Sequence, residues 1–266
     1  MLTMDSFFDL SDCPFADLFN GCVYPWEPLK KLKDHMTLYT TPAFQHLCLA
    51  DGVPLPSPYI FLNGKLRNAR ECIISYGDIT RGGLTVWENG QILEGASVIM
   101  AGAVLMGRNI NIGKGVLIES GALIKAPAII GDYSEIRQGA YLRGHCLIGR
   151  RCVVGHTTEC KHSIFFNDAK AGHFAYLGDS ILGNNVNLGA GTKCANLRFL
   201  PGNVVVKTPV GSLDSGLRKL GAIMGDNTQT GCNAVTSPGT LMKPDCILMP
   251  NTTAAAGLYM QKTVIR

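Results

Sequence analysis

The sequence is poor in charged residues, and those it has form no block of one sign. Asp, Glu, Lys and Arg make up 17% of the 266 residues, and the net charge is +4. A chain without a basic block gives little support for nucleic-acid binding. The N-terminus, MLTMDSFFDLSDCPF, has no basic leader ahead of an apolar stretch, so we expect no signal peptide. The longest apolar run, Ala96 to Met106, is too short to cross a bilayer.

Motifs typical of zinc fingers are also missing, because no CxxC pair occurs. Hydrophobic residues make up 46% of the chain, which indicates an ordered globular protein. Its length allows a large core in one domain or two. The ten cysteines are expected to be buried thiols rather than disulfides. We predict a cytoplasmic protein that binds neither membranes nor nucleic acid.

A six-residue repeat dominates the middle of the chain. An apolar residue stands at every sixth position: Met100, Met106, Ile112, Ile118, Ile124, Ile130, Ile136, Leu142, Ile148, Val154 and Cys160. Four residues after each of these, up to Thr158, stands a small or β-branched residue or a cysteine, including Cys146 and Cys152. An α-helix cannot use this step, because its face recurs every 3.6 residues. Short parallel strands can, so we predict an all-β fold, a parallel β-helix of hexapeptide coils.

The repeat does not cover the whole chain. Residues 1–90 are predicted to form a small mixed α/β cap, with helices at 12–18 and 27–36 and strands at 59–62 and 71–75. Residues 91–266 are predicted to be the solenoid domain, with about five coils before residue 193. One residue is missing from the step between Cys160 and Phe165, and another between Leu177 and Leu182.

The six-residue repeat is interrupted at residues 195–219, which we predict to be a long excursion loop of functional or interfacial importance. It resumes at Met224, Thr230, Thr236, Met242 and Leu248. The tail, residues 254–266, is expected to extend the solenoid or to turn back as a short helix.

Three cations recur at a spacing of one coil. Lys125, Arg143 and Lys161 each follow an apolar repeat position, and three hexapeptides separate each from the next. Parallel strands lie about 4.8 Å apart, so these residues should stack in a column whose like charges repel. A bound phosphate could offset the charge. Acidic neighbours or solvent could do the same, and the residues alone leave both possibilities open.

Two segments resemble a known enzyme family. They are KAGHFAYLGD at residues 170–179 and NVNLGAGT at residues 185–192, followed shortly by Asn196. Together they resemble the acetyltransferase half of the bacterial bifunctional N-acetylglucosamine-1-phosphate uridyltransferase, and its archaeal-type relatives, over residues 92–254. The resemblance implies a left-handed β-helix and a homotrimer with active sites between subunits. It also implies transfer of acetyl from acetyl-CoA to an amino-sugar phosphate, with glucosamine-1-phosphate as the expected acceptor on the route to UDP-N-acetylglucosamine.

Matched residue by residue, the resemblance assigns catalytic roles. His173 matches the general base, Glu159 the carboxylate that supports it, and Asn196 an active-site asparagine. Ala190 matches a backbone contact near the acetyl-CoA thioester. The chemistry agrees, because an amine attacks a thioester only when unprotonated and a histidine can take its proton near neutral pH. A carboxylate can orient the ring, and a backbone N–H can hold the developing oxyanion.

The resemblance assigns binding roles too. Arg143 and Lys161 match ligands of the sugar phosphate, and Tyr176 and Asn187 match substrate contacts. In the coenzyme region a family serine aligns with Cys232 and an alanine with Pro250.

Two further positions depart from the family pattern. The family tyrosine after the active-site asparagine is Leu197 here. A loop lysine has no aligned match, and Lys207 or Arg218 is a possible substitute. No Gly-rich phosphate loop precedes the solenoid, so we expect nucleotidylyl transfer to be absent.

Two other functions stay open. The segment Gly155-His156 and the later His162 are similar to an element of γ-class carbonic anhydrases, which bind zinc. Here five residues separate the two histidines where that family has four, and no third histidine aligns, so no metal site is predicted. A non-catalytic trimeric scaffold that binds a sugar nucleotide would keep the basic column without needing His173 beside Glu159.

Overall fold

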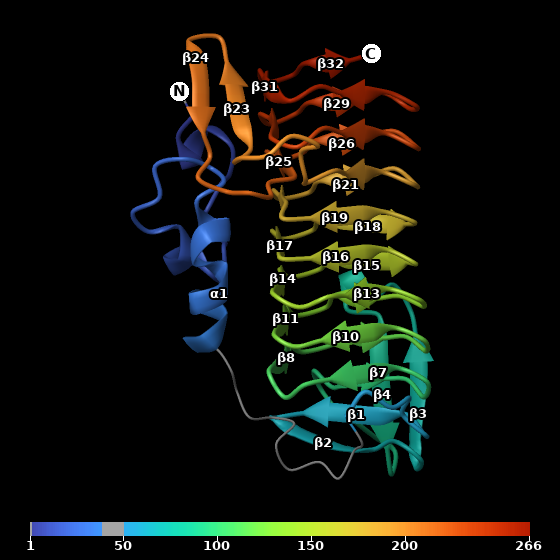
Figure 1. The fold of residues 1–266 in the computed structure, drawn as a ribbon. Coiled ribbons are helices and arrows are strands. Elements are labelled where there is room, and N and C mark those ends of the chain that lie inside the picture. The colour runs from blue at the N-terminus through green and yellow to red at the C-terminus, as the bar shows by residue number, and fades with distance from the viewer. Residues whose placement is uncertain (1, 39–50) are drawn as a thin grey trace.

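The computed structural model describes residues 2–38 and 51–266, and its body is a β-solenoid of stacked coils (Figure 1). Each coil adds strands to three parallel sheets. Sheet 1 contains β6 (Ser97–Ile99), β9 (Leu117–Ile118), β12 (Glu135–Ile136), β15 (Val153–His156), β18 (Lys170–His173), β21 (Asn187–Leu188), β26 (Gln229–Thr230), β29 (Ile247–Leu248) and β32 (Val264–Ile265). The predicted β-solenoid is therefore confirmed.

The other two sheets each have eight strands. Sheet 2 contains β7 (Val104–Met106), β10 (Leu123–Lys125), β13 (Tyr141–Leu142), β16 (Glu159–Lys161), β19 (Tyr176–Gly178), β22 (Lys193–Cys194), β27 (Val235–Thr236) and β30 (Thr253–Ala254). Sheet 3 contains β8 (Ile110–Ile112), β11 (Ala128–Ile130), β14 (Cys146–Ile148), β17 (Ser163–Phe165), β20 (Ile181–Leu182), β25 (Ala222–Met224), β28 (Thr240–Met242) and β31 (Gly257–Tyr259).

The six-residue step correctly predicts the interior of the coils from Ile112 onward. The apolar residues at this step, Ile112 to Cys160, all lie in one buried cluster. Cys146 and Cys152 fill the small inward positions and are fully buried. Burial raises the pKa of the Cys152 thiol to about 12, which keeps it protonated. In the described part of the chain the cysteines are free thiols.

The repeat is displaced by one residue in the first coil. Ile99, not Met100, pairs with Ile118 and is buried. In the same way Leu105, not Met106, pairs with Ile124, and Met106 is 36% exposed. The turn before β8 holds one extra residue, which restores the step. The assignment of Met100 and Met106 to the interior was therefore wrong, because both adjoining positions are apolar and the sequence alone does not separate them.

The two predicted one-residue deletions are confirmed by the strand register. Phe165 pairs with Ile148 of the coil below and with Leu182 of the coil above, and each pair is 17 residues apart. Cys160 and Leu177 pair at the same spacing. The shortened coils are those that carry the KAGHFAYLGD segment.

Residues 2–38 lie alongside sheet 3 (Figure 1). This segment holds the short 3-10 helices η1 (Met4–Ser6) and η2 (Ala16–Phe19) and the helix α1 (Pro28–Leu38). The helix predicted at 27–36 is confirmed as α1, and the one predicted at 12–18 is only η2. In α1 the residues Leu29, Leu32 and Met36 form one buried stripe. The outward residues of sheet 3 are apolar because this segment covers them, forming a second core.

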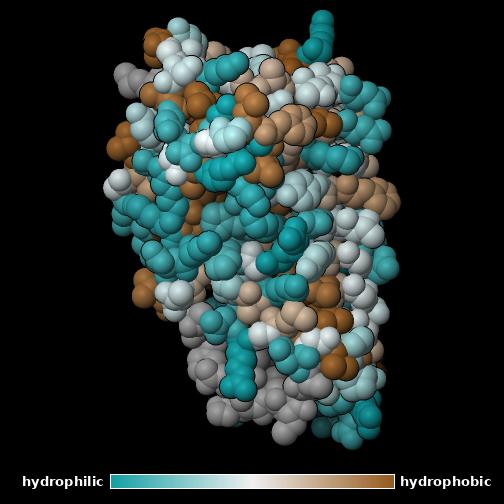
Figure 2. Space-filling view, in the orientation of Figure 1, coloured by the Kyte–Doolittle hydropathy of each residue, from teal (hydrophilic) through white to brown (hydrophobic). Residues whose placement is uncertain are grey.

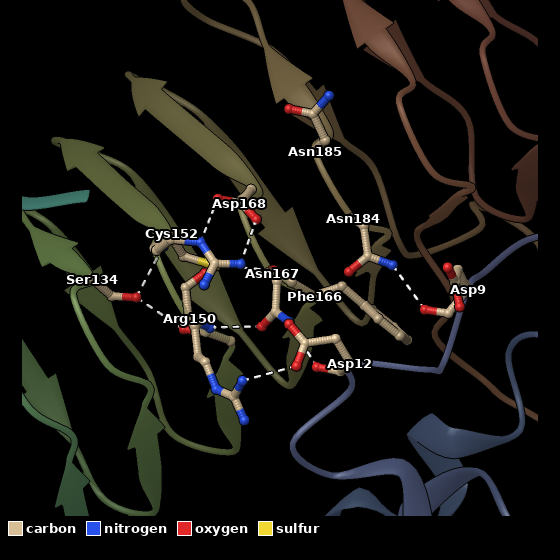
Figure 3. Close-up of polar contacts among 12 residues, drawn as sticks. Asp9, Asp12, Ser134, Arg150, Cys152, Phe166, Asn167, Asp168, Asn184 and Asn185 are labelled. Atoms are coloured by element: carbon tan, nitrogen blue, oxygen red, sulfur yellow. Dashed lines mark hydrogen bonds and ion pairs between the residues drawn. The ribbon is translucent and has the colours of Figure 1, made fainter. Parts of the chain in front are cut away.

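Aromatic and polar contacts fix the N-terminal segment to the solenoid. The ring of Phe166 stacks on Phe8, with centroids 4.8 Å apart. Figure 3 shows the polar contacts beside it. Arg150 donates to the Asp12 carboxylate at 2.9 Å, Asn167 donates to the Asp12 carbonyl at 2.8 Å, and Asn184 donates to the carbonyl of Asp9 at 2.9 Å.

Residues 51–92 cover the first coil. The strand predicted at 59–62 is confirmed as β1 (Tyr59–Leu62). It runs antiparallel to β6, and β2 (Lys65–Asn68) pairs with β1. A three-stranded sheet of β3 (Cys72–Tyr76), β4 (Leu84–Glu88) and β5 (Gln91–Ile92), with η3 (Ile79–Arg81) at its tip, packs on the outer face of sheet 1 through an apolar cluster. The strand predicted at 71–75 is β3, shifted by one residue.

Between β22 and β25 the chain leaves the solenoid. It forms an antiparallel hairpin of β23 (Val205–Thr208) and β24 (Gly211–Asp214), which stands beside the N-terminal segment in Figure 1. Val204 and Val206 are buried in the same cluster as Trp26, whose Nε1 donates to the Ser215 carbonyl at 3.2 Å. After the hairpin the solenoid continues through β32, so the tail extends it and forms no helix.

Two features describe the molecular surface. On the face shown in Figure 2, hydrophobic residues are scattered among polar ones rather than gathered in one large patch. None of the helices within the described ranges is long and apolar enough to cross a membrane.

Candidate functional site

The outer face of sheet 2 carries the three cations of the predicted column. Leu142 of β13 pairs with Ile124 of β10 and with Cys160 of β16. The residues that follow these three positions therefore stack, as the sequence predicted: Lys125, Arg143 and Lys161.

Each cation of the column has a partner within the chain. Arg143 donates to Glu159 at 2.6 Å, and Lys161 lies 3.2 Å from the Asp179 carboxylate. The ammonium of Lys125 lies 5.6 Å from the centre of the Tyr141 ring, within the range of a cation–π contact. The hydrogen bond with Glu159 raises the pKa of Arg143. The side chains of Arg143 and Lys161 remain 42% and 28% exposed, so both stay accessible from solvent.

Tyr176 and Asn196 lie in the next coils of the same face. Asn196 follows β22, is buried, and donates through Nδ2 to Asp179 at 2.5 Å. The Tyr176 hydroxyl lies 3.5 Å from Asn196 Oδ1. Burial and then the charges of Glu159 and Asp179 raise the pKa of Tyr176, which keeps its phenol a donor. A side chain at Gly178 would collide with the Asn196 amide and the Tyr176 hydroxyl.

His173 stands at the corner where sheet 1 ends. It is the last residue of β18, and its exposed ring stacks on that of His156, with centroids 5.6 Å apart and planes at 24°. Its carbonyl accepts a 2.9 Å bond from the N–H of Gly191. Among the described residues, Arg143 is the only partner of the Glu159 carboxylate, which makes no hydrogen bond to the ring of His173. The expected pairing of Glu159 with His173 is therefore not formed in this structure.

The residues assigned to coenzyme binding line one corner of the solenoid. Ala190, Cys232 and Pro250 lie in the turns that follow β21, β26 and β29. Successive turns are joined by backbone bonds, from Asn233 to Ala190 at 2.7 Å and from Asn251 to Cys232 at 2.9 Å. Since Gly191 bonds to His173, this column of turns continues directly from the His173 corner.

Asn187 lies beside this column of turns. It is exposed on β21 and pairs in register with Lys170 of β18. The structure thus forms two groups: a cation, tyrosine and asparagine group on sheet 2, and a histidine and turn group along the corner.

Asp179 had no role assigned from the sequence, and His156 and His162 entered only as the histidines of the carbonic-anhydrase alternative. Asp179 accepts from Lys161, from Asn196 and from His162, whose Nδ1 lies 2.8 Å away. It is the last residue of KAGHFAYLGD, so the motif contained the signal. His156 stacks on His173 because the shortened coil places residues 17 apart in register.

The described residues offer no group of three or more His, Cys, Asp or Glu side chains that could hold a metal ion. His156 faces His173, whereas His162 bonds to Asp179. The two histidines of the carbonic-anhydrase alternative therefore contact different residues.

Known proteins match this part of the chain. A family model described as the GMPPB C-terminal domain matches residues 124–211. A bifunctional sugar-1-phosphate nucleotidylyltransferase/acetyltransferase of Sulfurisphaera tokodaii is 39% identical over 100 residues, covering 38% of this chain and 25% of the relative. The bifunctional protein GlmU of Methanocaldococcus jannaschii is 40% identical over 107 residues, covering 40% and 26%. That of Acaryochloris marina is 35% identical over 133 residues, covering 50% and 24%.

The chain thus spans about a quarter of the length of these relatives. The names of these relatives describe bifunctional proteins. The matched part of this chain lies in the solenoid built of six-residue steps. By sequence and by fold, the chain is a hexapeptide-repeat solenoid that resembles the bifunctional sugar-1-phosphate nucleotidylyltransferase/acetyltransferases.

Proposed function

We propose that the chain transfers the acetyl group of acetyl-CoA to the amino group of an amino-sugar phosphate. Glucosamine-1-phosphate is the acceptor we propose, with N-acetylglucosamine-1-phosphate for UDP-N-acetylglucosamine synthesis as the product. The observation that carries the proposal is the grouping of Arg143, Lys161, Tyr176 and Asn196 on one face. The names of the relatives support acetyl transfer, and the proposal covers that activity alone.

The proposed reaction divides the work between the two groups. Arg143 and Lys161 bind the phosphate, since charge-assisted bonds are the strong ones. The exposed His173 takes the proton of the amine as its nitrogen forms a bond to the thioester carbon. The carbon–sulfur bond then breaks, and the leaving sulfur takes the proton held by His173, so that coenzyme A departs as the thiol. A backbone N–H of the turn at Ala190 holds the developing oxyanion.

The proposed assembly is a homotrimer in which the excursion reaches a neighbouring subunit. Exposed apolar residues support this: Phe199 and Val210 are fully exposed, Leu200 is largely exposed and Leu197 is about half exposed. Such residues gathered on one excursion are typical of an interaction surface. Light scattering at micromolar concentration should give three times the mass of the chain, and a monomer would contradict the assembly.

The decisive test is release of free thiol from acetyl-CoA in the presence of single acceptors. The panel comprises glucosamine-1-phosphate, galactosamine-1-phosphate, UDP-glucosamine and unphosphorylated glucosamine. We expect turnover with the first and little with the last. No thiol release with any member would contradict the proposed activity.

One observation favours a second function, a scaffold that binds a sugar nucleotide without turnover. Glu159 bonds to Arg143 rather than to His173, so the histidine lacks the carboxylate support expected of a base. Binding of UDP-N-acetylglucosamine in calorimetry, with no thiol release for any acceptor, would favour this scaffold.

A further inference from the structure

We propose that Asp179 is a positioning residue for the acceptor phosphate, because one buried carboxylate holds both Lys161 and Asn196. The inference rests on the function proposed above and gives a role to the last residue of the KAGHFAYLGD segment, to which the resemblance assigned none. Asp179 itself is 8% exposed at its side chain, so it acts on the substrate through the two residues it holds.

Both carboxylate oxygens of Asp179 are engaged. Oδ2 accepts from Asn196 at 2.5 Å and from Lys161 at 3.2 Å, and Oδ1 lies 2.8 Å from Nδ1 of His162. Three donors therefore converge on one side chain, two from the consecutive residues Lys161 and His162 and one from Asn196, which follows β22. Removing its charge would release all three together.

His162 bonds to the other oxygen of this carboxylate, and both side chains are largely buried. Since a carboxylate only accepts, Nδ1 of His162 must carry the proton of this bond. Its Nε2 is buried and has no hydrogen-bond partner in the part of the chain that the structure describes. The ring of His145 lies edge-on to the His162 ring, with centroids 6.1 Å apart. The bond to Asp179 is thus the one polar bond that this ring makes within the described residues.

The backbone places Asp179 without help from a loop. Asp179 and His162 both have a left-handed conformation, with φ of 48° each, in successive turns of the solenoid. The N–H of Asp179 donates to the Lys161 carbonyl at 3.0 Å, and the Gly221 N–H donates to the Asp179 carbonyl at 2.8 Å. The stacking of coils therefore fixes the carboxylate.

This arrangement orders Lys161 before any ligand arrives. A lysine side chain loses considerable rotamer freedom when it is held in one orientation. With Asp179 in place that loss occurs on folding, so a phosphate meets an ammonium that is already oriented. The pair of Lys161 and Asn196 then acts as a fixed frame for the acceptor.

The test substitutes Asp179→Asn, because asparagine tolerates the left-handed conformation and keeps the side-chain size. In calorimetry, binding of glucosamine-1-phosphate should weaken about 10- to 100-fold, the cost expected of a misplaced binding group. The KM for this acceptor should rise in parallel, whereas the KM for acetyl-CoA should not change. Asp179→Glu, which keeps the charge, should recover part of the affinity.

Asp168→Asn is the matched control. Asp168 also stands in a left-handed turn, with φ of 64°, and it pairs with Arg151 through two bonds of 2.8 Å away from the candidate site. Its substitution should leave acceptor binding and both KM values unchanged. A purely structural role of Asp179 would instead lower thermal stability and affect both substrates equally.

A second measurement needs no substrate. Reductive methylation followed by mass spectrometry compares Lys161 with Lys125, which occupies the equivalent position two coils below. We expect Lys161 to react more slowly in the wild type and the difference to disappear in Asp179→Asn. Equal rates in the wild type, or a difference that survives the substitution, would overturn the proposal. So would unchanged or tighter acceptor binding by Asp179→Asn, since the carboxylate would then merely compete with phosphate.

The two proposals fail in different ways. Acceptor binding that depends on Asp179, with no acetyl transfer, would contradict the enzyme and leave the positioning role intact. Acetyl transfer that is insensitive to Asp179→Asn would contradict the positioning role and leave the enzyme intact.

Discussion

The guanidinium of Arg143 donates a 2.6 Å hydrogen bond to the carboxylate of Glu159. Glu159 stands on β16 opposite Tyr141 of the neighbouring strand β13, and Arg143 directly follows β13. The resemblance placed them in different parts of the mechanism, one at the phosphate and one behind the base. Their direct bond indicates that Glu159 orients the cation in this structure.

This relationship predicts the effect of Glu159→Gln. The substitution keeps a hydrogen-bonding side chain and removes only the charge, and the pair is partly exposed. Pairs of this kind contribute about 0.2–1 kcal/mol. The KM for glucosamine-1-phosphate should therefore rise by no more than about fivefold, with a smaller change in kcat. Steady-state kinetics with the acceptor varied measures both. A loss of kcat as large as that of His173→Ala would show instead that Glu159 serves the base.

His173→Ala should lower kcat by about 10² to 10⁴, the usual contribution of a positioned general base. The side chain is exposed, so the fold should persist. Single-turnover assays measure the rate, and circular dichroism checks the fold. His156→Ala is the control, because it removes the stacked ring and leaves the proposed base. Wild-type turnover by His173→Ala would mean that this histidine is structural.

The six-residue period was sufficient to predict the solenoid, because the apolar residues at this step from Ile112 to Cys160 are all buried in one cluster. It failed at Met100 and Met106, where Ile99 and Leu105 are equally apolar. It also gave no sign that residues 2–38 lie along sheet 3. That placement depends on long-range packing of aromatic rings such as Phe8 on Phe166, which no local pattern encodes.

The basic column predicts a preference for phosphorylated acceptors. A charge-assisted hydrogen bond contributes about 1.5–3 kcal/mol. Arg143→Ala should therefore lower kcat/KM for glucosamine-1-phosphate about 10- to 100-fold and affect unphosphorylated glucosamine far less. The ratio of the two kcat/KM values is the measurement. Lys125→Ala, which removes the cation over the Tyr141 ring one coil further from His173, is the control and should change the ratio less. A ratio that is unchanged in Arg143→Ala would mean that the column is an ordinary solvated edge.

Cys232 should be the most reactive cysteine among the described residues. It is the exposed one, whereas burial raises the pKa of Cys13 and Cys194 to about 11 and of Cys152 to about 12. Since the thiolate is the nucleophile, iodoacetamide should label Cys232 first, as peptide mass spectrometry can show. If its turn contacts coenzyme A, acetyl-CoA should slow this labelling. Labelling at the same rate with saturating acetyl-CoA would place the coenzyme elsewhere.

The stacking of residues along the coils was easier to predict than the hydrogen-bond and ion-pair partners of their side chains. The stacking of Lys125, Arg143 and Lys161 followed from the coil length. The coil length did not predict which carboxylate each cation would contact, because Asp179 pairs with Lys161 from the next coil. One coil shortened to 17 residues is enough to change which side chains oppose each other.

The carboxylates of Asp179 and Asp226 should make the free energy of unfolding respond to pH in opposite directions. For Asp179, burial alone would raise the pKa, but the hydrogen bond with His162 and the charge of Lys161 outweigh it and hold the pKa below its usual 3.8. For Asp226, burial outweighs the bonds from Asp9 and Asn184 and raises the pKa above 3.8. A lowered folded-state pKa contributes stability above pH 3.8 that is lost as the pH falls through the folded value. A raised one makes the folded state bind the extra proton, so stability increases as the pH falls toward 3.8.

Urea unfolding of the wild type, Asp179→Asn and Asp226→Asn at a series of pH values measures both effects. The free-energy difference between the wild type and Asp179→Asn should be constant near neutrality and shrink below about pH 4. As the pH falls, the wild type should gain stability relative to Asp226→Asn, and this gain should begin above about pH 4. Each variant is the control of the other, because both replace a turn aspartate by its neutral isostere. Two differences that move in the same direction would contradict the assignment, since burial and pairing would then not decide the sign.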